Sequence, residues 1–415
     1  MITAQPNVHP SKQRQIVTTE EGYKMKTSRR RWLAVVIVVV SILTSVSSAA
    51  GQGRAPIELA MISPLTGPLS FVGLDNRAGV QAAVREINRA GGIRGRQIRL
   101  TTFDDASNPS QGVVHMQRIA SEAKYVGVIG SGFSSVGLAV APIVAASKIP
   151  YISMASSAAQ VTPAKPYYFM TTATSRLFAY SMAAQLRKAG VKRIALMNDN
   201  GGFGQEGLRN VKELARRYGF EIVEEIVFPL TSTSFTAELT RVKNSNAQVL
   251  WLWNATSLAV TITKDAKQLG LPQRLAFTGG NASPLFLGPA CPEANGALIN
   301  TYLGPVARYI KRTHPSRAIA LRVNRLIGKQ GSTFNYDGYT AIRMFREAML
   351  KGGLTRARIN DALETKMKGF AGPGGRYFYS AVNHSGLQTD SMVVSNIRNC
   401  KMVPVPGQKI LQATK

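Results

Sequence analysis

The stretch Tyr125–Thr162 reads YVGVIGSGFSSVGLAVAPIVAASKIPYISMASSAAQVT, and it decides the fold of this chain. Its first apolar run, Val126–Gly130, is short, β-branched and bounded by glycine, which predicts a buried strand of a parallel sheet. Apolar residues then recur at helical spacing up to Lys148. We therefore expect Ser134 and Ser135 at the N-terminus of a helix.

A second short strand is predicted at Ile149–Ser153, and it runs directly into the small residues Ala155, Ser156 and Ser157. Where strands end and helices begin in an open α/β sheet, free backbone N–H groups and a positive helix dipole hold small anions such as carboxylates. Two such strand ends side by side predict one ligand site. The alternative is that these serines only cap helices.

The composition is that of a globular chain with a strong basic excess. With 415 residues and 45% apolar content the chain can bury a sizeable core, and its length suggests two domains or lobes. The formal charge is +29, and the first 50 residues contribute seven basic and two acidic side chains, which leaves +24 for the rest. Lys and Arg are spread over most predicted helices without interleaved aromatics, so we expect no nucleic-acid partner.

The first 50 residues have the features of an export signal. Arg29–Arg31 form a basic segment, Trp32–Val46 form an apolar run of 15 residues, and small residues follow. This run is shorter than the roughly 20 residues that a membrane span needs. We therefore expect a secretory signal peptide with an N-terminal extension over residues 1–50, cleaved after Ala49 or Ala50, and a periplasmic mature chain.

Two questions about this segment stay open from the sequence. Translation starts at Met1 or at Met25, since the residues before Met25 are polar and unpatterned. The export route is the general secretory one or the twin-arginine one, because Ser28–Leu33 resembles a twin-arginine signal. No cysteine lies near the expected cut, which argues against a lipoprotein anchor, and no later segment is long and apolar enough to span a membrane.

The chain has two cysteines, Cys291 and Cys400. In an oxidising compartment they could pair and close a long loop, or they could be two free thiols. We expect no metal site, because two distant cysteines and the scattered histidines His115, His314 and His384 supply too few ligands.

Strand and helix signals alternate along the rest of the chain. Four alternations between Ile57 and Thr174 imply a parallel, doubly wound sheet, and a second similar series begins near Thr174. An α/β chain with two similar lobes is therefore expected. Three helices near the end have no strands of their own, so we expect them to pack back onto an earlier lobe. They are predicted around Pro315–Leu326, Phe334–Lys351 and Thr355–Thr365, before a strand-rich end at Arg376–Val394.

The sequence offers one motif typical of a cofactor site, and it is incomplete. Residues 202–207 read GFGQEG, a G-x-G-x-x-G between a predicted strand and a predicted helix. A dinucleotide site also needs an acidic residue at the end of the next strand, where Val227-Phe228-Pro229 stands instead. A glycine turn explains the motif better, and no cofactor is expected.

Signals of catalysis are weak. No G-x-S-x-G elbow is present, and none of the histidines has the context of a base. The adjacent Asp104 and Asp105 point to opposite faces of a strand, so turn or helix capping explains them better than shared acid/base chemistry. Trp251 and Trp253 share one face of a strand, where core packing is the default for aromatics, although Trp253 lies at the strand end, where a ligand would be.

Several of these stretches together resemble the type I periplasmic binding proteins of the leucine/isoleucine/valine and amide-type ABC importers. The resemblance covers residues 57–400 in the expected order, and its motifs are specific jointly rather than singly. The segments that carry it are Ser63–Pro68 with Gly73, Phe103–Pro109, Gly130–Ser135, Ile149–Ser153, Ala155–Ser157, Phe203-Gly204 and Gly270–Pro272.

The resemblance implies two Rossmann-like lobes with parallel sheets, joined by three chain crossings and closing around a ligand by hinge motion. On this pattern the crossings fall near Thr174, Tyr302 and Arg376. Lobe 1 would hold residues 56–174 and 303–375, lobe 2 would hold residues 175–302 and 376–405, and residues 406–415 would form a tail.

The resemblance also implies site residues. In amino-acid-binding members, serines at the positions of Ser134 and Ser157, with nearby backbone N–H groups, hold the ligand carboxylate, while a carbonyl at the position of Ala155 helps to hold the ammonium. Phe71, Phe203 and Trp253 stand at or beside positions where the family places aromatic walls. The candidate ligand-binding residues are Phe71, Ser134, Ser135, Ala155, Ser156, Ser157, Phe203, Trp253 and Asn281.

One departure from the family's pattern bears on the ligand. The family's acidic partner for the ammonium follows the strand near Thr278, and the matching residue here is Asn281. A neutral amide offsets the desolvation of an ammonium less well than a carboxylate does. The ligand is therefore expected to be a small organic acid, an aromatic carboxylate or an amide at least as often as a branched-chain amino acid.

The function that the resemblance implies is capture of an exported solute and its delivery to an ABC permease in the inner membrane. No reaction is expected, and the protein is expected to act as a monomer. The alternative is a soluble sensor of the same fold that passes ligand occupancy to a regulatory partner. An enzyme is the third possibility, and turnover of a bound acid would support that possibility.

Overall fold

The computed structural model describes residues 54–408 and residue 411. The expected signal peptide and both possible starts lie outside these residues, as does most of the expected tail beyond residue 408.

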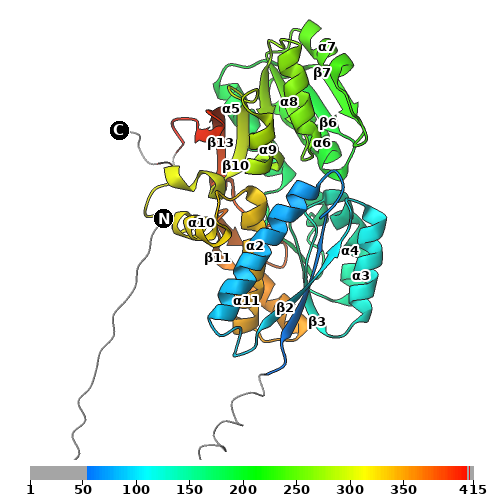
Figure 1. Cartoon of the computed structure of the whole chain (residues 1–415), viewed down its shortest axis with the longest axis vertical. Helices are drawn as coiled ribbons and strands as arrows, with labels where there is room; N and C mark the ends of the chain where they lie inside the picture. Colours follow the sequence, from blue (N-terminus) through cyan, green and yellow to red (C-terminus); the bar gives the residue numbers. More distant parts are fainter. Residues whose placement is uncertain (1–53, 409–410, 412–415) are drawn as a thin grey trace, which may run out of the picture. The chain divides into compact units, whose positions relative to one another are not determined.

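The first lobe is built on a sheet of five strands in which every pair of neighbours is parallel, in the order β2-β1-β3-β4-β5. The strands are β1 (Ile57–Ser63), β2 (Ile98–Asp104), β3 (Tyr125–Ile129), β4 (Tyr151–Ser153) and β5 (Tyr168–Met170). Its first helices are α2 (Ser70–Arg89), α3 (Pro109–Ser121) and α4 (Ser134–Ser147). The expected doubly wound sheet is confirmed, and Figure 1 shows this lobe in blue and cyan.

The second lobe is built on a sheet of seven strands in the order β14-β13-β10-β9-β8-β6-β7. Strands β6 to β10 are parallel, and β13 and β14 add two antiparallel strands at one edge. The strands are β6 (Arg193–Asp199), β7 (Glu221–Phe228), β8 (Val249–Trp253), β9 (Arg274–Phe277), β10 (Leu298–Tyr302), β13 (Met392–Arg398) and β14 (Lys401–Pro404). The helices are α5 (Ser175–Lys188), α6 (Gly202–Tyr218), α7 (Thr236–Asn244), α8 (Leu258–Gln268) and α9 (Pro284–Ala290).

Local signals place the helix starts of the first lobe. Asn108 caps α3, because its side-chain oxygen accepts hydrogen bonds from the backbone N–H groups of Ser110 and Gln111, and a proline follows at the first helical position. α4 begins at Ser134, as predicted, but its cap residue is Phe133, which has no side-chain capping bond. The first turn of α4 therefore keeps backbone N–H groups without a side-chain cap.

The helices of the C-terminal part return to the first lobe, as predicted. They are α10 (Pro315–Ile327), α11 (Thr333–Lys351) and α12 (Arg356–Lys366). α11 lies along α2 so closely that a Cβ at Gly79 would stand 1.9 Å from the carbonyl oxygen of Asn335. A Cβ at Gly338 would stand 2.3 Å from the oxygen of Asn76, so both glycines are required for this approach.

The segment after α12 stays with the first lobe longer than the expected crossing near Arg376. It forms the ribbon of β11 (Lys368–Ala371) and β12 (Arg376–Phe378). Tyr377 donates to the carbonyl of Thr171 at 2.7 Å, and the backbone N–H of Met170 donates to the carbonyl of His384 at 2.9 Å. We therefore propose that the third crossing lies between His384 and β13.

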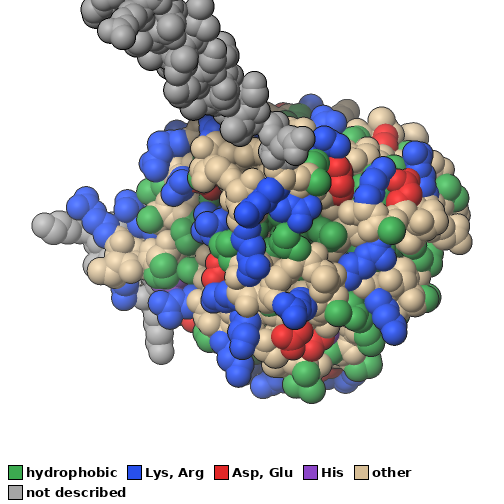
Figure 2. Space-filling view, turned by 90° about the horizontal axis from the view of Figure 1, so that it is seen from below, with side chains coloured by type: hydrophobic (Ala, Val, Ile, Leu, Met, Phe, Trp, Pro, Cys, Tyr) green, Lys and Arg blue, Asp and Glu red, His purple; other side chains and the backbone are tan. Residues whose placement is uncertain are grey.

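The surface carries its basic excess in a dispersed form. On the face that Figure 2 shows, Lys and Arg side chains alternate with hydrophobic and polar ones, and acidic side chains are few. This agrees with the sequence, in which the basic residues do not gather in one segment.

The described part of the chain lacks two kinds of feature, a membrane-spanning helix and a cluster of metal ligands. No helix there combines the length and the apolar character needed to cross a membrane. No three His, Cys, Asp or Glu side chains there come together as ligands for a metal ion.

Candidate ligand-binding site

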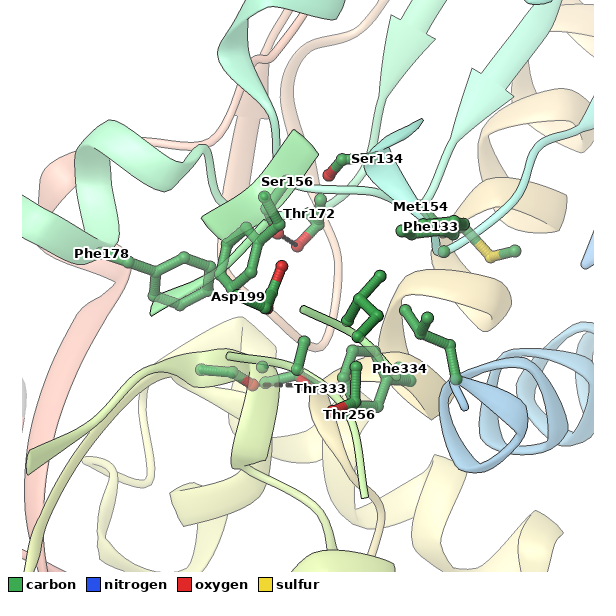
Figure 3. Close-up of a pocket in the computed structure, with 17 residues that line it drawn as sticks. Phe133, Ser134, Met154, Ser156, Thr172, Phe178, Asp199, Thr256, Thr333 and Phe334 are labelled. Carbon is green, nitrogen blue, oxygen red and sulfur yellow. Dashed lines mark hydrogen bonds between the residues drawn. The ribbon is translucent and has the colours of Figure 1, made fainter. Parts of the chain in front are cut away.

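A cavity lies between the two lobes, where their strands end and their helices begin (Figure 3). It is narrow, with about 30 Å³ for the centres of water-sized molecules, and residues of both lobes line it. Its apolar lining includes Phe133, Met154, Phe178, Phe203 and Phe334. Its polar lining comes from Ser134, Ser156, Thr172, Asp199, Thr256 and Thr333.

The first lobe contributes the start of α4 and the loop after β4. Ser134 is buried, and its hydroxyl oxygen accepts a hydrogen bond of 3.3 Å from the backbone N–H of Ser157. The two serines therefore lie together, although they are 23 residues apart in the chain. Ser156 and Thr172 share a hydrogen bond of 3.2 Å between their hydroxyl groups on the same side of the cavity.

The second lobe contributes a carboxyl group, that of Asp199 at the end of β6. One oxygen accepts from the backbone N–H of Gly201 at 2.8 Å, and the other accepts from the side-chain amide of Asn254 at 3.0 Å. Burial raises the pKa of Asp199 to about 6, against the lowering effect of these hydrogen bonds. The carboxyl group is therefore ionised at neutral pH.

Aromatic rings support the apolar wall in two layers. Phe203 lines the cavity, and the ring of Trp253 lies behind it with 5.4 Å between the ring centroids. Phe334 also lines the cavity, and Phe71 packs against it edge-to-face at 5.9 Å. Edge-to-face and tilted pairs of this kind fix the orientation of the inner rings.

Hydrogen bonds between the lobes hold the cavity closed. Glu206 of α6 is buried and accepts from the hydroxyl of Ser157 and from the backbone N–H of Ala158 at 2.8 Å. It also accepts from the hydroxyl of Ser175, in its own lobe. In the first turn of α4, the hydroxyl oxygen of Ser135 accepts from the backbone N–H of Gly202 at 3.0 Å.

Of the nine candidate residues, Ser134, Ser156 and Phe203 line the cavity directly. Phe71 and Trp253 stand one layer behind it, and Ser135 and Ser157 are engaged in the bonds between the lobes.

The other two candidates are buried beside the cavity. The carbonyl of Ala155 accepts from the side-chain amide of Gln160 at 3.1 Å. The amide of Asn281 is buried, with no partner for either of its polar atoms among the described residues.

Sequence reasoning missed Asp199, Glu206, Thr172 and Phe334. Asp199 has a signal in the sequence, since it lies two residues after the apolar run that ends at Met197 and so stands at the edge of a parallel sheet where ligands bind. Glu206 has none, because its partners Ser157 and Ala158 are nearly 50 residues away in the chain and in the other lobe.

The fold and this site define a two-lobed solute-binding protein. A family model described as periplasmic binding protein matches residues 56–399. The chain belongs to this family, whose members bind solutes in the periplasm or outside the cell.

Known relatives agree with this assignment. The chain is 25% identical over 321 residues to the Leu/Ile/Val-binding protein BraC3 of Rhizobium johnstonii, covering 76% of this chain and 84% of that protein. An extracellular ligand-binding receptor from Rhodopseudomonas palustris HaA2 has the same fold, with a TM-score of 0.79, 21% identity and coverage of 85% and 100%. A solute-binding protein of an ABC transporter from R. palustris, solved with benzoate, follows at a TM-score of 0.76, 19% identity and coverage of 84% and 95%.

Proposed function

We propose that this protein captures a small carboxylate or amide ligand in the cavity between its lobes and delivers it to an ABC permease in the inner membrane. The ligand is a branched-chain amino acid, an aromatic acid or another organic acid or amide. The observation that carries the proposal is the closed cavity, which has the start of α4 on one side and a second lobe on the other.

The chemistry of the lining supports this class of ligand. The first turn of α4 supplies backbone N–H groups and the positive end of a helix dipole, which attract a carboxylate or a carbonyl oxygen. Ser134 adds a hydroxyl group at the same place, and the eight apolar side chains of the lining cover the body of the ligand. Ser134, Ser156 and Phe203 are therefore the residues that we propose to touch the ligand.

The relatives support a transport role without fixing the ligand. The relative from Rhizobium is named for leucine, isoleucine and valine, and the structure from R. palustris contains benzoate. A binding protein of this kind releases its ligand unchanged, so we propose that no reaction takes place in the cavity.

Mass spectrometry of small molecules that co-purify with the protein is the first test. Calorimetric titration then measures the affinity of each molecule found, together with branched-chain amino acids, benzoate and their amides. Saturable binding of one of them at a ratio of one ligand per chain, with the ligand recovered intact, supports the proposal. A panel without any binding, or recovery of a converted product, contradicts it.

A further inference from the structure

The cavity offers a ligand an acidic side chain and no basic one. Among the described residues that line it, Asp199 is the one with an ionisable side chain, and the others are apolar residues, hydroxyl residues or glycines. Figure 3 shows Asp199 among the side chains that surround the cavity. A ligand carboxylate therefore relies on hydroxyl and backbone N–H groups alone.

Some of those donors are already engaged within the chain. The hydroxyl of Ser157 and the backbone N–H of Ala158 both donate to the carboxylate of Glu206. The backbone N–H of Ser157 donates to Ser134. Glu206 thus occupies two donors of this loop, and the hydroxyl of Ser134 and the backbone N–H groups in the first turn of α4 remain for a ligand carboxylate.

Asp199, in contrast, keeps capacity to accept hydrogen bonds. Its partners, the backbone N–H groups of Gly201 and Gly204 and the amide of Asn254, are all neutral and leave about one acceptor site free. A carboxylate has about four acceptor sites. An ionised carboxylate buried among neutral groups is stabilised strongly by a further donor, above all by a cationic one.

We propose that Asp199 is a specificity-determining residue that selects ligands presenting an N–H donor, as an ammonium or a primary amide, over bare carboxylic acids. This inference rests on the proposed function, because it narrows the class of ligand for the same cavity. It also assigns to β6 the acidic role that the resemblance places at Asn281, whose side chain does not line the cavity.

The physical reason is the burial of this carboxyl group. Asp199 is 4% exposed, so water screens its charge only weakly from a ligand carboxylate, and an anionic ligand either meets a like charge or must bring a proton. A ligand nitrogen with N–H groups meets an acceptor instead. The same apolar body is therefore expected to bind better with the nitrogen than without it.

The test compares matched pairs of ligands by calorimetry at about pH 7.5. The pairs are leucine with 4-methylpentanoate, phenylalanine with 3-phenylpropanoate, and benzamide with benzoate. For the wild-type protein we expect the nitrogen-bearing member of the bound pair to have an affinity at least roughly tenfold higher. In Asp199→Asn, which removes the charge and keeps an oxygen for Gly201, this preference should fall to within about threefold.

Asp105→Asn is the matched control, because Asp105 is also a buried aspartate but does not line the cavity, and it should keep the wild-type preference. A second measurement needs only the wild-type protein. Titrations in two buffers of different ionisation enthalpy give the number of protons taken up or released when the ligand binds. Net proton uptake is expected with the acid and not with its nitrogen-bearing partner.

The outcomes separate the two proposals. If an acid binds as tightly as its partner at about pH 7.5 without proton uptake, Asp199 does not select the ligand, and the proposed function stands. If Asp199→Asn fails to fold, the proton uptake measured with the wild-type protein tests the role of Asp199 instead. If no member of any pair binds, the proposed function itself fails, and this inference fails with it.

Discussion

Single side chains around the cavity divide into those that meet a ligand and those that stabilise the walls. We propose that Ser134 belongs to the first group, since it lines the cavity and its hydroxyl oxygen accepts from Ser157, while its own O–H has no acceptor among the described residues. Asp105 belongs to the second group. It is buried at the end of β2 and accepts from the backbone N–H of Ser107 at 2.9 Å.

Replacing Ser134 with alanine should weaken ligand binding. The variant loses a hydrogen bond to a charged or strongly polar ligand group, which costs about 2 kcal/mol, or roughly thirtyfold in Kd. Calorimetric titration with the ligand found by mass spectrometry measures the change. Ser121→Ala, on the exposed end of α3, should leave Kd unchanged, and an unaltered Kd in Ser134→Ala would show that this hydroxyl does not contact the ligand.

The buried carboxyl group of Asp105 should make the free energy of unfolding depend on pH. Burial raises its pKa to about 6, against the effect of hydrogen bonds from Ser131 and Ser107, whereas the unfolded carboxyl has an ordinary value of 3.8. The unfolded chain therefore loses this proton first, so the contribution of Asp105 to stability falls between about pH 4 and pH 6 and stays low above that. Asp105→Asn removes this loss.

The stability of Asp105→Asn relative to the wild type should rise by up to about 3 kcal/mol on going from about pH 4 to pH 7. Urea unfolding at several pH values measures the difference, which does not depend on any fixed cost of the amide. Parallel stability curves for the two proteins would contradict the assignment.

At the scale of elements, α6 joins the lobes through its first two turns. Gly202 donates to Ser135 at the start of α4, and Glu206, one turn later, accepts from the loop after β4.

The same helix begins with the G-x-G-x-x-G motif. A Cβ at Gly204 would stand 2.0 Å from the backbone oxygen of Asp199, and at Gly207 it would stand 2.2 Å from the ring of Trp253. The glycines therefore serve close packing.

Glu206 should stabilise the closed form. Replacing it with alanine removes the acceptor of two donors from the first lobe and should weaken ligand binding roughly tenfold or more, mainly through faster dissociation. Stopped-flow kinetics measures both rates. Glu213→Gln is the control, because Glu213 lies on the same helix in an exposed ion pair with Arg176. Equal dissociation rates in Glu206→Ala and the wild type would exclude this role.

The turn between β13 and β14 brings Cys400 to Cys291 at the end of α9. Both are free thiols in the structure, and burial together with a hydrogen bond and charge interaction from Cys400 raises the pKa of Cys291 to about 12. The backbone N–H of Cys400 donates to the side chain of Asn295 at 3.0 Å, which fixes the turn over this loop. We therefore predict that the two thiols can pair, which is one of the two possibilities that the sequence left open.

Treatment with oxidised glutathione should convert these two thiols into an intrachain disulfide, with the glutathione reduced to its thiol. The bridge closes a loop of about 110 residues, for which the chain-entropy model gives a stabilisation of roughly 5 kcal/mol. Peptide mapping and thermal unfolding check the bond and its effect, and Cys400→Ser should show neither. Oxidised protein that contains only mixed disulfides with glutathione would contradict the pairing.

At the scale of the whole molecule, the lobes meet at more points than α6. Ser283 of the second lobe donates to Asp75 of α2 at 2.9 Å, and Lys329 pairs with the same carboxylate at 2.9 Å. The hydroxyl of Thr333 donates to the carbonyl of Gly279 at 3.2 Å beside the cavity. The closed arrangement therefore has contacts of its own, and the ligand adds to them.

Ligand binding should shift the protein toward this closed form and raise its thermal stability. At a ligand concentration of about 100 times Kd the expected gain is about 2.7 kcal/mol, growing with the logarithm of concentration. Differential scanning calorimetry measures the gain, and small-angle scattering measures the accompanying fall in radius of gyration. Stabilisation without any compaction would contradict closure by hinge motion.

The sequence by itself determined the α/β class, the two similar lobes and the start of α4 at Ser134, because these depend on apolar periodicity and on residue types within a few positions. It also placed Ser134, Ser156 and Phe203 correctly at strand ends and helix starts, although only the structure places them on one cavity.

The tertiary structure alone decided which polar groups are free for a ligand. Glu206 occupies the donors of Ser157 and Ala158 across the two lobes, and the return of α11 to α2 brings Thr333 and Phe334 to the cavity. These pairings join residues nearly 50 to more than 250 positions apart, and no local pattern records them, because hydrogen-bond partners are set by how the lobes close. The physical reason is that local propensity fixes elements, whereas long-range packing fixes the chemistry between them.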